Sequence, residues 1–376
     1  MHIGIISEYF PQSEKIEIRG GAEARTFHIG KHLAKNHQIT IITSREPVTE
    51  REDEVLGMKV FRVGKTRSYS QSGSLLQRAS FIRQAIKVGK RQNLDVVEGT
   101  NFLSYPPAWK IGEHLDIPRV ITYHDVWVSR WIKNIGIAGV FGEVLERYAL
   151  SKKWNLIFAN SNYTKSNLEK VGVKSSIVVV PNGVDLERYR SIWVEKFENP
   201  TICTISRLVK YKRLEDLIRA VGLIREDMPD VNLKIIGSGP EEDNLRELVK
   251  ELGLEENVEF LGFVEGHDDV IRVLKASHVF ALPSVVEGFG MVVIEALAAG
   301  IPYVASNISP VYEVTNGGVG GLLFEPMNHE DLAEKLKVVL RSSENLLDGL
   351  DGFIEEYDWG RIASEVERYY ESLLRE

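Results

Sequence analysis

The sequence predicts an α/β protein built on parallel, doubly wound sheets. Short runs of β-branched and aliphatic residues alternate with longer helical patterns, an order that is typical of βαβ units. The length of 376 residues favours two domains, and a hydrophobic content of 43% allows each domain to bury a core. Because ligands bind beyond the carboxyl ends of the strands in such sheets, we expect the functional residues in the loops that follow the strands.

The first half of the chain contains seven expected strands and five expected helices. The strands are His2–Ser7, Gln38–Thr43, Met58–Val63, Leu94–Glu98, Arg119–Tyr123, Asn155–Ala159 and Ile177–Val180. The helices are Ala22–Lys35, Leu75–Arg91, Pro106–His114, Phe141–Lys152 and Tyr163–Lys170. Pro181, Asn182 and Gly183 then supply the residues of a turn or linker. We therefore divide the chain into domains of residues 1–190 and 191–358.

The second half repeats the alternation. Strands are expected at Thr201–Ile205, Leu233–Ile236, Val258–Gly262, Val279–Leu282 and Tyr303–Ser306. Helices are expected at Leu214–Ile224 and Met291–Ala299, and a last amphipathic helix covers residues 359–376.

One stretch of the second half, Ser284–Ser306, carries the clearest chemistry. A strand, a glycine-rich turn and a short helix place Glu287 and Glu295 eight positions apart. The amides of residues 289–292 form an anion site, since unpaired N–H groups and the helix dipole both attract negative charge. A nucleotide sugar offers phosphates to the amides and hydroxyls to the two carboxylates. The alternative is that Glu287 caps the helix and that Glu295 faces solvent.

Three further turns carry candidate ligand-binding residues. Arg207 and Lys212 lie where a strand turns into a helix, which suits a diphosphate, although basic residues on a helix start are also common on plain surfaces. Gly237 and Gly239 form a Gly-x-Gly turn without the third glycine of a dinucleotide fingerprint. His124 follows a strand, as a catalytic residue or a satisfied core histidine would.

The string from Glu287 to Glu295 resembles the E-x7-E signature of glycosyltransferase family four, whose members are retaining enzymes of GT-B architecture. Further segments match the family's pattern in the same order: the glycine loop at Arg19–Glu23, His124-Asp125, the PNGVD segment at 181–185, the Arg-x4-Lys pair and the GxGP turn at 237–240. The resemblance implies two Rossmann-like domains that face each other across a cleft. It also implies that the first domain lies on the acceptor side, that the second binds the nucleotide sugar, and that the last helix packs back on the first.

The resemblance also assigns a role to each matching residue. Arg207 and Lys212 would neutralise the leaving diphosphate, together with the amides of Phe289, Gly290, Met291 and Val292. Glu295 would bind the ribose hydroxyls, while Glu287 and His124 would bind the transferred sugar. Gly237 and Gly239 would lie near the nucleotide, and backbone groups at Phe263 and Val264 would hold its base. Gly20 and Gly21 would face the donor phosphate and the acceptor.

We expect no cofactor and no metal. The chain has a single cysteine, Cys203, no Cys/His spacing of a metal site, and no Asp-x-Asp pair. Gly64-Lys65-Thr66 resembles the end of a phosphate-binding Walker loop, but Lys59 stands where that motif requires glycine. The expected substrate is a UDP- or GDP-linked sugar, and the acceptor is a sugar or a lipid-linked glycan.

The charge and hydropathy of the sequence limit its expected partners and location. The net charge of −8 argues against a nucleic-acid partner. The N-terminus lacks a basic leader, and no apolar run approaches the ~20 residues of a membrane span, so we expect a cytoplasmic protein, soluble or peripherally bound to a membrane. Residues 59–91 contain basic but no acidic side chains: Lys59, Arg62, Lys65, Arg67, Arg78, Arg83, Lys87, Lys90 and Arg91.

This basic island is either a surface for anionic lipid or a solvated face over a core helix. An aromatic and basic stretch, Trp127, Trp131 and Lys133, follows it in the sequence. Two other functions remain open on the sequence alone: a nucleotide-sugar epimerase of GT-B fold, and a non-catalytic subunit that binds a nucleotide sugar.

Overall fold

The computed structural model describes residues 1–12, 18–68, 74–132, 136–342 and 346–375, which fold into two units. The first unit comprises Met1–Asn182 and Trp359–Glu376, and the second comprises Gly183–Asp358. The expected boundary at 190/191 falls inside helix α7 (Leu186–Ser191) and is therefore corrected. Leu186 and Tyr189 of this helix are buried in the core of the second unit, which explains why the division comes before it.

The sheet of the first unit has eight strands in the order β3-β4-β2-β1-β5-β6-β7-β8. All neighbours are parallel except β3, which pairs antiparallel with β4. The strands are β1 (His2–Ile6), β2 (Gln38–Ser44), β3 (Glu52–Val55), β4 (Met58–Val63), β5 (Val96–Gly99), β6 (Arg119–Tyr123), β7 (Leu156–Ala159) and β8 (Ile177–Val179).

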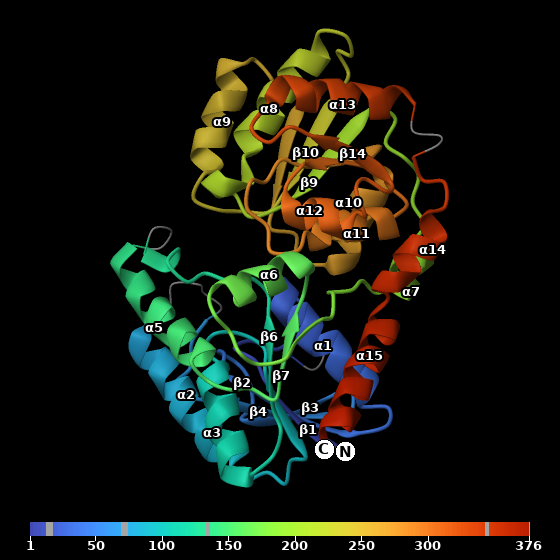
Figure 1. The fold of residues 1–376 in the computed structure, drawn as a ribbon. Helices are drawn as coiled ribbons and strands as arrows, with labels where there is room; N and C mark the ends of the chain where they lie inside the picture. Colours follow the sequence, from blue (N-terminus) through green and yellow to red (C-terminus); the bar gives the residue numbers. More distant parts are fainter. Residues whose placement is uncertain (13–17, 69–73, 133–135, 343–345, 376) are drawn as a thin grey trace. The chain divides into compact units, whose positions relative to one another are not determined.

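Helices cover both faces of this sheet (Figure 1). The helices of the first unit are α1 (Gly21–Leu33), α2 (Leu75–Gly89), α3 (Tyr105–Leu115), α5 (Gly139–Leu150), α6 (Asn162–Lys170) and α15 (Trp359–Leu373), with a 3-10 turn η1 (Gly136–Ala138). One core lies between the sheet and α2, α3 and α5. On the other face α15 packs on α1, where the rings of His28 and Trp359 stack with centroids 5.3 Å apart.

The sheet of the second unit has six parallel strands in the order β11-β10-β9-β12-β13-β14. The strands are β9 (Thr201–Ile205), β10 (Asn232–Ile236), β11 (Val258–Gly262), β12 (Val279–Leu282), β13 (Tyr303–Ser306) and β14 (Gly321–Phe324). Taken in chain order, this is the 3-2-1-4-5-6 arrangement of a Rossmann fold, so the strand order reverses between β9 and β12.

Two hydrophobic cores lie on opposite faces of this second sheet. One contains residues of α8 (Leu214–Arg225), α9 (Glu242–Glu251) and α13 (His329–Arg341). The other contains residues of α7, α10 (His267–Ala276), α11 (Met291–Ala298), α12 (Ser309–Val314) and α14 (Leu350–Ile354). Two 3-10 turns, η2 (Lys210–Lys212) and η3 (Glu355–Tyr357), complete the unit.

The expectation of an α/β protein with doubly wound sheets is confirmed in both units. Strand β3 was not expected from the sequence, because its charged Glu52-Asp53-Glu54 run lacks the apolar pattern of a buried strand. Leu56 and Gly57 join β3 to β4 with positive φ angles of 48° and 80°, a combination typical of a type I′ hairpin turn.

The structure corrects part of the expected basic island. Arg62 and Arg67 are buried rather than on the surface, and each pairs with an acidic residue outside the island. Arg62 Nη2 lies 3.5 Å from Asp53, and Arg67 Nη2 lies 2.8 Å from Glu8. Three side chains of the island on or beside α2 are exposed: Arg83, Lys87 and Arg91. Lys133 of the aromatic and basic stretch lies outside the described residues.

Candidate functional site

In the second unit, the loops after β9 and β12 meet where the strand order reverses. Lys212 follows β9 and Glu287 follows β12, and the distance from Lys212 Nζ to Glu287 Oε1 is 2.5 Å. Both side chains are largely enclosed, with 14% and 12% of their surfaces exposed. The structure therefore joins two residues that the sequence separates by 75 positions.

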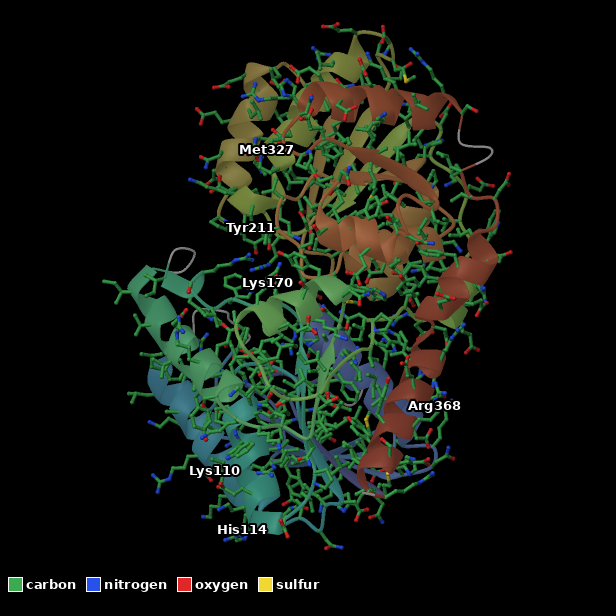
Figure 2. The ribbon with its side chains drawn as sticks, in the orientation of Figure 1. Lys110, His114, Lys170, Tyr211, Met327 and Arg368 are labelled. Carbon is green, nitrogen blue, oxygen red and sulfur yellow. The ribbon has the colours of Figure 1, made fainter. Side chains whose placement is uncertain are left out.

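Tyr211, which the sequence analysis did not single out, links three parts of this site. Its hydroxyl accepts a hydrogen bond of 2.5 Å from Arg207 Nη2, and its backbone carbonyl accepts one of 2.9 Å from the amide of Val285. Figure 2 labels Tyr211 in the segment between β9 and α8. Tyr211 thus ties the basic pair to the loop that carries Glu287. Burial raises the pKa of its phenol, although the positive charge of Arg207 opposes the shift.

The start of α11 presents unpaired backbone donors. Among the described residues, no hydrogen-bond acceptor lies opposite the amides of Phe289, Gly290, Met291 and Val292. Gly290 stands at the N-cap with φ 96° and ψ 40°, a left-handed conformation that glycine adopts without strain. The start of α11 thus offers a set of free N–H groups at a helix N-terminus, and anion binding by them stays a prediction.

Glu295 lies on the second turn of α11. Within the described part of the chain no hydrogen-bond donor or cation contacts its carboxylate, and burial raises its pKa to about 7. A carboxylate without such a partner gains stability from any ligand that donates hydrogen bonds to it.

The Gly-x-Gly turn has a structural explanation. A Cβ atom on Gly237 would lie 1.9 Å from the carbonyl oxygen of Ser206, and one on Gly239 would lie 2.4 Å from that of Leu208. The turn after β10 therefore packs directly on the loop that leads from β9 to Arg207. This contact accounts for both glycines, and a direct contact with a nucleotide stays a prediction.

Phe263 and Val264 follow β11 at the same edge of the sheet. The side chain of Phe263 is 60% exposed, while Val264 is partly exposed. The contact of this segment with a base stays a prediction, and an exposed aromatic ring is a side chain on which a base can stack.

In the first unit, His124 follows β6 and is held by the loop after β5. Its Nε2 lies 3.1 Å from the carbonyl oxygen of Thr100. Since a carbonyl only accepts hydrogen bonds, Nε2 carries the proton and Nδ1 remains an acceptor. Burial, with the charge of Arg25 adding to it, lowers the pKa of His124 to about 3, so the ring is neutral at physiological pH.

Gly20 and Gly21 begin α1 at the same edge of the first sheet, and both are exposed. Arg19 precedes them and is held by two carboxylates: Nη1 lies 2.7 Å from Glu46, and Nη2 lies 3.0 Å from Glu23. Burial opposes the charge of Arg19, but these carboxylates hold its pKa above the ordinary value. The glycine loop is therefore anchored by an internal ion-pair network.

Each unit thus gathers its own predicted residues at the carboxyl edge of its sheet. The second unit brings Arg207, Lys212, Glu287 and the start of α11 together, and the first unit places His124 and Gly20-Gly21 in loops after β6 and β1. Cys203 is buried and, among the described residues, no group of three or more His, Cys, Asp or Glu side chains could hold a metal ion.

Two family models match the chain. The model described as Glycosyltransferase Family 4 matches residues 19–188, and the model described as Glycosyl transferases group 1 matches residues 185–348. An uncharacterized glycosyltransferase of Haemophilus influenzae is 38% identical over 171 residues, which are 45% of this chain and 46% of that protein. The chain thus matches about half the length of this relative.

Solved structures resemble the whole chain. Sucrose-phosphate synthase of Thermosynechococcus elongatus superimposes with a TM-score of 0.83 at 19% identity, covering 99% of both chains. HepE of Anabaena, in complex with UDP and glucose, superimposes with a TM-score of 0.76 at 20% identity, covering 99% of this chain and 100% of that one. At these identities the similarity establishes the GT-B fold and not the substrate.

Proposed function

Since the chain belongs to glycosyltransferase family 4, whose models together span residues 19–348, we propose that it is a retaining glycosyltransferase. It moves a sugar from a nucleotide-diphosphate sugar to an acceptor hydroxyl. The observation that carries this proposal is the Lys212–Glu287 pair beside the unpaired amides of α11. This arrangement combines a cation and N–H donors for phosphate with a carboxylate for hydroxyls.

The leaving diphosphate accumulates negative charge as the glycosidic bond breaks. Arg207, Lys212 and the amides of residues 290–292 are the groups that stabilise this charge, and donors aimed at developing charge usually lower the activation barrier more than any other catalytic effect. With two side-chain cations in this role, the reaction requires no metal.

The remaining residues recognise the donor. Glu295 accepts hydrogen bonds from the ribose, which supply the partners that its carboxylate lacks among the described residues. Glu287 accepts from hydroxyls of the transferred sugar after Lys212 turns to the phosphate. The neutral His124 offers Nδ1 as an acceptor for a sugar hydroxyl.

Retention at the anomeric carbon is proposed to occur on one face of the sugar. The acceptor hydroxyl approaches on the side from which the diphosphate leaves, and the leaving phosphate takes the proton of that hydroxyl. No covalent intermediate forms on the protein, in contrast to retaining glycosidases, which use a carboxylate nucleophile.

The first experiment is a thermal-shift panel of UDP-, GDP- and ADP-glucose, each with and without a chelator. A ligand at a hundredfold excess over its Kd adds about 2.7 kcal/mol to the free energy of unfolding. We expect one base to raise the Tm in a chelator-independent way, and we expect Lys212→Met to abolish that shift. If none of the three sugars shifts the wild-type Tm, the proposed donor site is wrong.

Product analysis separates transfer from the other functions of this fold. A transferase releases the nucleoside diphosphate when an acceptor is present. A retaining transferase forms an α-linked product from an α-linked donor, and the coupling constant of the anomeric proton identifies that linkage. Release of an epimer without acceptor would favour an epimerase, and binding without turnover would favour a non-catalytic subunit.

We also propose that the acceptor is presented at an anionic membrane surface, with the exposed cations on and beside α2 making the contact. The exposure of Arg83, Lys87 and Arg91 supports this proposal. Each basic residue near an anionic surface contributes about 1 kcal/mol to the free energy of membrane binding. No described helix is both long and apolar enough to span a bilayer. Flotation with vesicles containing phosphatidylglycerol should therefore depend on salt and be lost in the R83E/K87E/R91E variant. Equal flotation of the variant would contradict the proposal.

A further inference from the structure

Three aromatic side chains lie in the loops after β5 and β6, the loops that also carry Thr100 and His124, and have no part in the proposed donor site. Phe102 follows β5, and Trp127 and Trp131 lie in the loop after β6; we call them the aromatic group. The ring centroids of Phe102 and Trp131 are 4.8 Å apart, and those of Trp127 and Trp131 are 5.3 Å apart. Each of the three side chains is partly exposed, and Phe102 connects the group to the buried core through Tyr105 and Tyr123.

A buried carboxylate holds this group in place. Glu146 on α5 is 0% exposed, and it accepts hydrogen bonds of 2.6 Å from Trp131 Nε1 and of 3.0 Å from the Trp127 amide. On the same helix Glu143 accepts a bond of 2.9 Å from the amide of Ser129, which has a φ of 67°. A buried carboxylate is costly unless it is fully bonded, so this loop is fixed with considerable precision.

Two glycines of α5 leave the space into which Trp131 packs. A Cβ atom on Gly142 would lie 2.5 Å from the Trp131 ring, and one on Gly139 would lie 2.4 Å from the Trp131 carbonyl oxygen. Trp131 therefore packs against the helix as a support. Trp127 rests on Trp131, and its own indole faces solvent in part.

Three described arginines near this edge of the sheet, Arg19, Arg25 and Arg67, have partners within the first unit. Glu23 and Glu46 neutralise Arg19, and Glu8 pairs with Arg67. Arg25 is buried and donates to the carbonyl oxygens of Val180 and Pro181. Arg130, in the same loop as Trp127, is exposed. The loops after β5 and β6 thus offer aromatic faces to a ligand, and the loop of Trp127 also carries an exposed cation.

We propose that the aromatic group binds the acceptor through a neutral sugar ring that stacks on the indole of Trp127. One face of a pyranose consists of C–H groups, which pack on an aromatic face, while its hydroxyls point sideways towards polar groups such as those of His124 and Asp125. This inference rests on the proposed function and narrows its acceptor class to neutral saccharides.

The test uses saturation-transfer NMR on the full chain, with glucose, N-acetylglucosamine and maltose as neutral probes and malate and inositol phosphate as anionic probes. All samples contain the nucleoside diphosphate whose sugar raises the Tm. The variants are Trp127→Ala, Trp127→Phe and Trp193→Phe. Trp193 is a matched control because it is 80% exposed but lies in the second unit.

We expect at least one neutral sugar to receive saturation on its C–H protons. Trp127→Ala should raise the Kd of that sugar about tenfold or more. Trp127→Phe should bind it nearly as the wild type does, and Trp193→Phe should not change its Kd. The proposal is overturned if Trp127→Ala binds the sugar as the wild type does, if only the anionic probes bind, or if no probe binds. The nucleotide thermal shift is read in the same samples. If the nucleotide does not shift the Tm of the wild type, the proposed donor site is wrong. If the nucleotide shifts the Tm but Trp127→Ala binds the sugar as the wild type does, only this inference is wrong.

Discussion

At the scale of single residues, Glu295 makes the donor site sensitive to pH. Its folded pKa of about 7 lies above the ordinary value because the carboxylate is buried. A ribose that donates hydrogen bonds requires the ionised form, so protonation competes with binding as the pH falls through 7. We expect the Kd of the preferred nucleotide sugar to be about tenfold higher at pH 6 than at pH 8.

A variant must isolate the contribution of Glu295, because burial also raises the pKa of Glu146 to about 7 and lowers that of Lys196 to about 8. A nucleotide sugar carries a diphosphate diester whose charge is constant over this range, so the ligand does not titrate. Burial also lowers the pKa of His267 to about 4, which keeps that histidine of the second unit neutral between pH 6 and 8. Glu295→Gln should weaken binding and remove its pH dependence. An unchanged pH profile in this variant would show that another group titrates.

A second prediction at this scale concerns Tyr211. Tyr211→Phe removes the hydroxyl that accepts from Arg207 but keeps the ring and the backbone bond to Val285. The loss of one hydrogen bond to a charged group near the surface should weaken nucleotide-sugar binding about two- to tenfold, with little change in Tm. Tyr148→Phe in the first unit is the control. Calorimetric titration that gives equal affinities for Tyr211→Phe and the wild type would exclude a positioning role.

At the scale of loops and strands, the turn after β10 depends on Gly237. This residue has a φ of 128°, and any Cβ atom there would collide with the Ser206 carbonyl oxygen. We expect Gly237→Ala to lower the free energy of unfolding by about 2 kcal/mol or more and to displace the loop that carries Arg207. Urea titration measures the first effect, and nucleotide-sugar affinity reports the second.

Gly222→Ala is the matched control for this prediction. Gly222 lies inside α8, and a Cβ atom there would meet only Leu254 at 3.8 Å, an ordinary contact. Alanine in a helix is favoured over glycine by about 0.5–1 kcal/mol, so this variant should be as stable as the wild type or more stable. Equal stability losses in the two variants would contradict the argument from loop packing.

The strands could be predicted closely from the sequence, because parallel strands buried on both faces appear as continuous apolar runs. β9, β11, β12 and β13 begin and end at the expected residues. The pairing of Lys212 with Glu287 could not be predicted, since it depends on how distant loops meet. Tyr211 carried no signal of its own within its turn. Arg62 and Arg67 looked like surface charges because their acidic partners lie outside the basic island.

At the scale of the whole molecule, the last helix belongs to the first unit although it follows the second in the sequence. Five side chains of α15 are buried: Trp359, Ile362, Ala363, Val366 and Tyr370. The hydroxyl of Tyr370 donates to Glu98, a buried carboxylate of β5 that also accepts from Thr122. Without α15, the first unit loses this apolar contact and leaves Glu98 short of one partner.

This division predicts different behaviour for the two halves when each is produced alone. Residues 183–358 contain both cores of the second sheet and should fold and bind the nucleotide sugar. Residues 1–182 should unfold at much lower urea concentration than the same segment joined to residues 359–376 by a glycine-serine linker. Burying the large apolar side chains of α15 contributes about 5 kcal/mol or more, a large part of the 5–15 kcal/mol that stabilises a typical domain. Urea unfolding followed by circular dichroism compares the two forms. Equal midpoints would mean that α15 does not stabilise the first unit. The buried Tyr370–Glu98 contact would then make no measurable contribution to its free energy of unfolding.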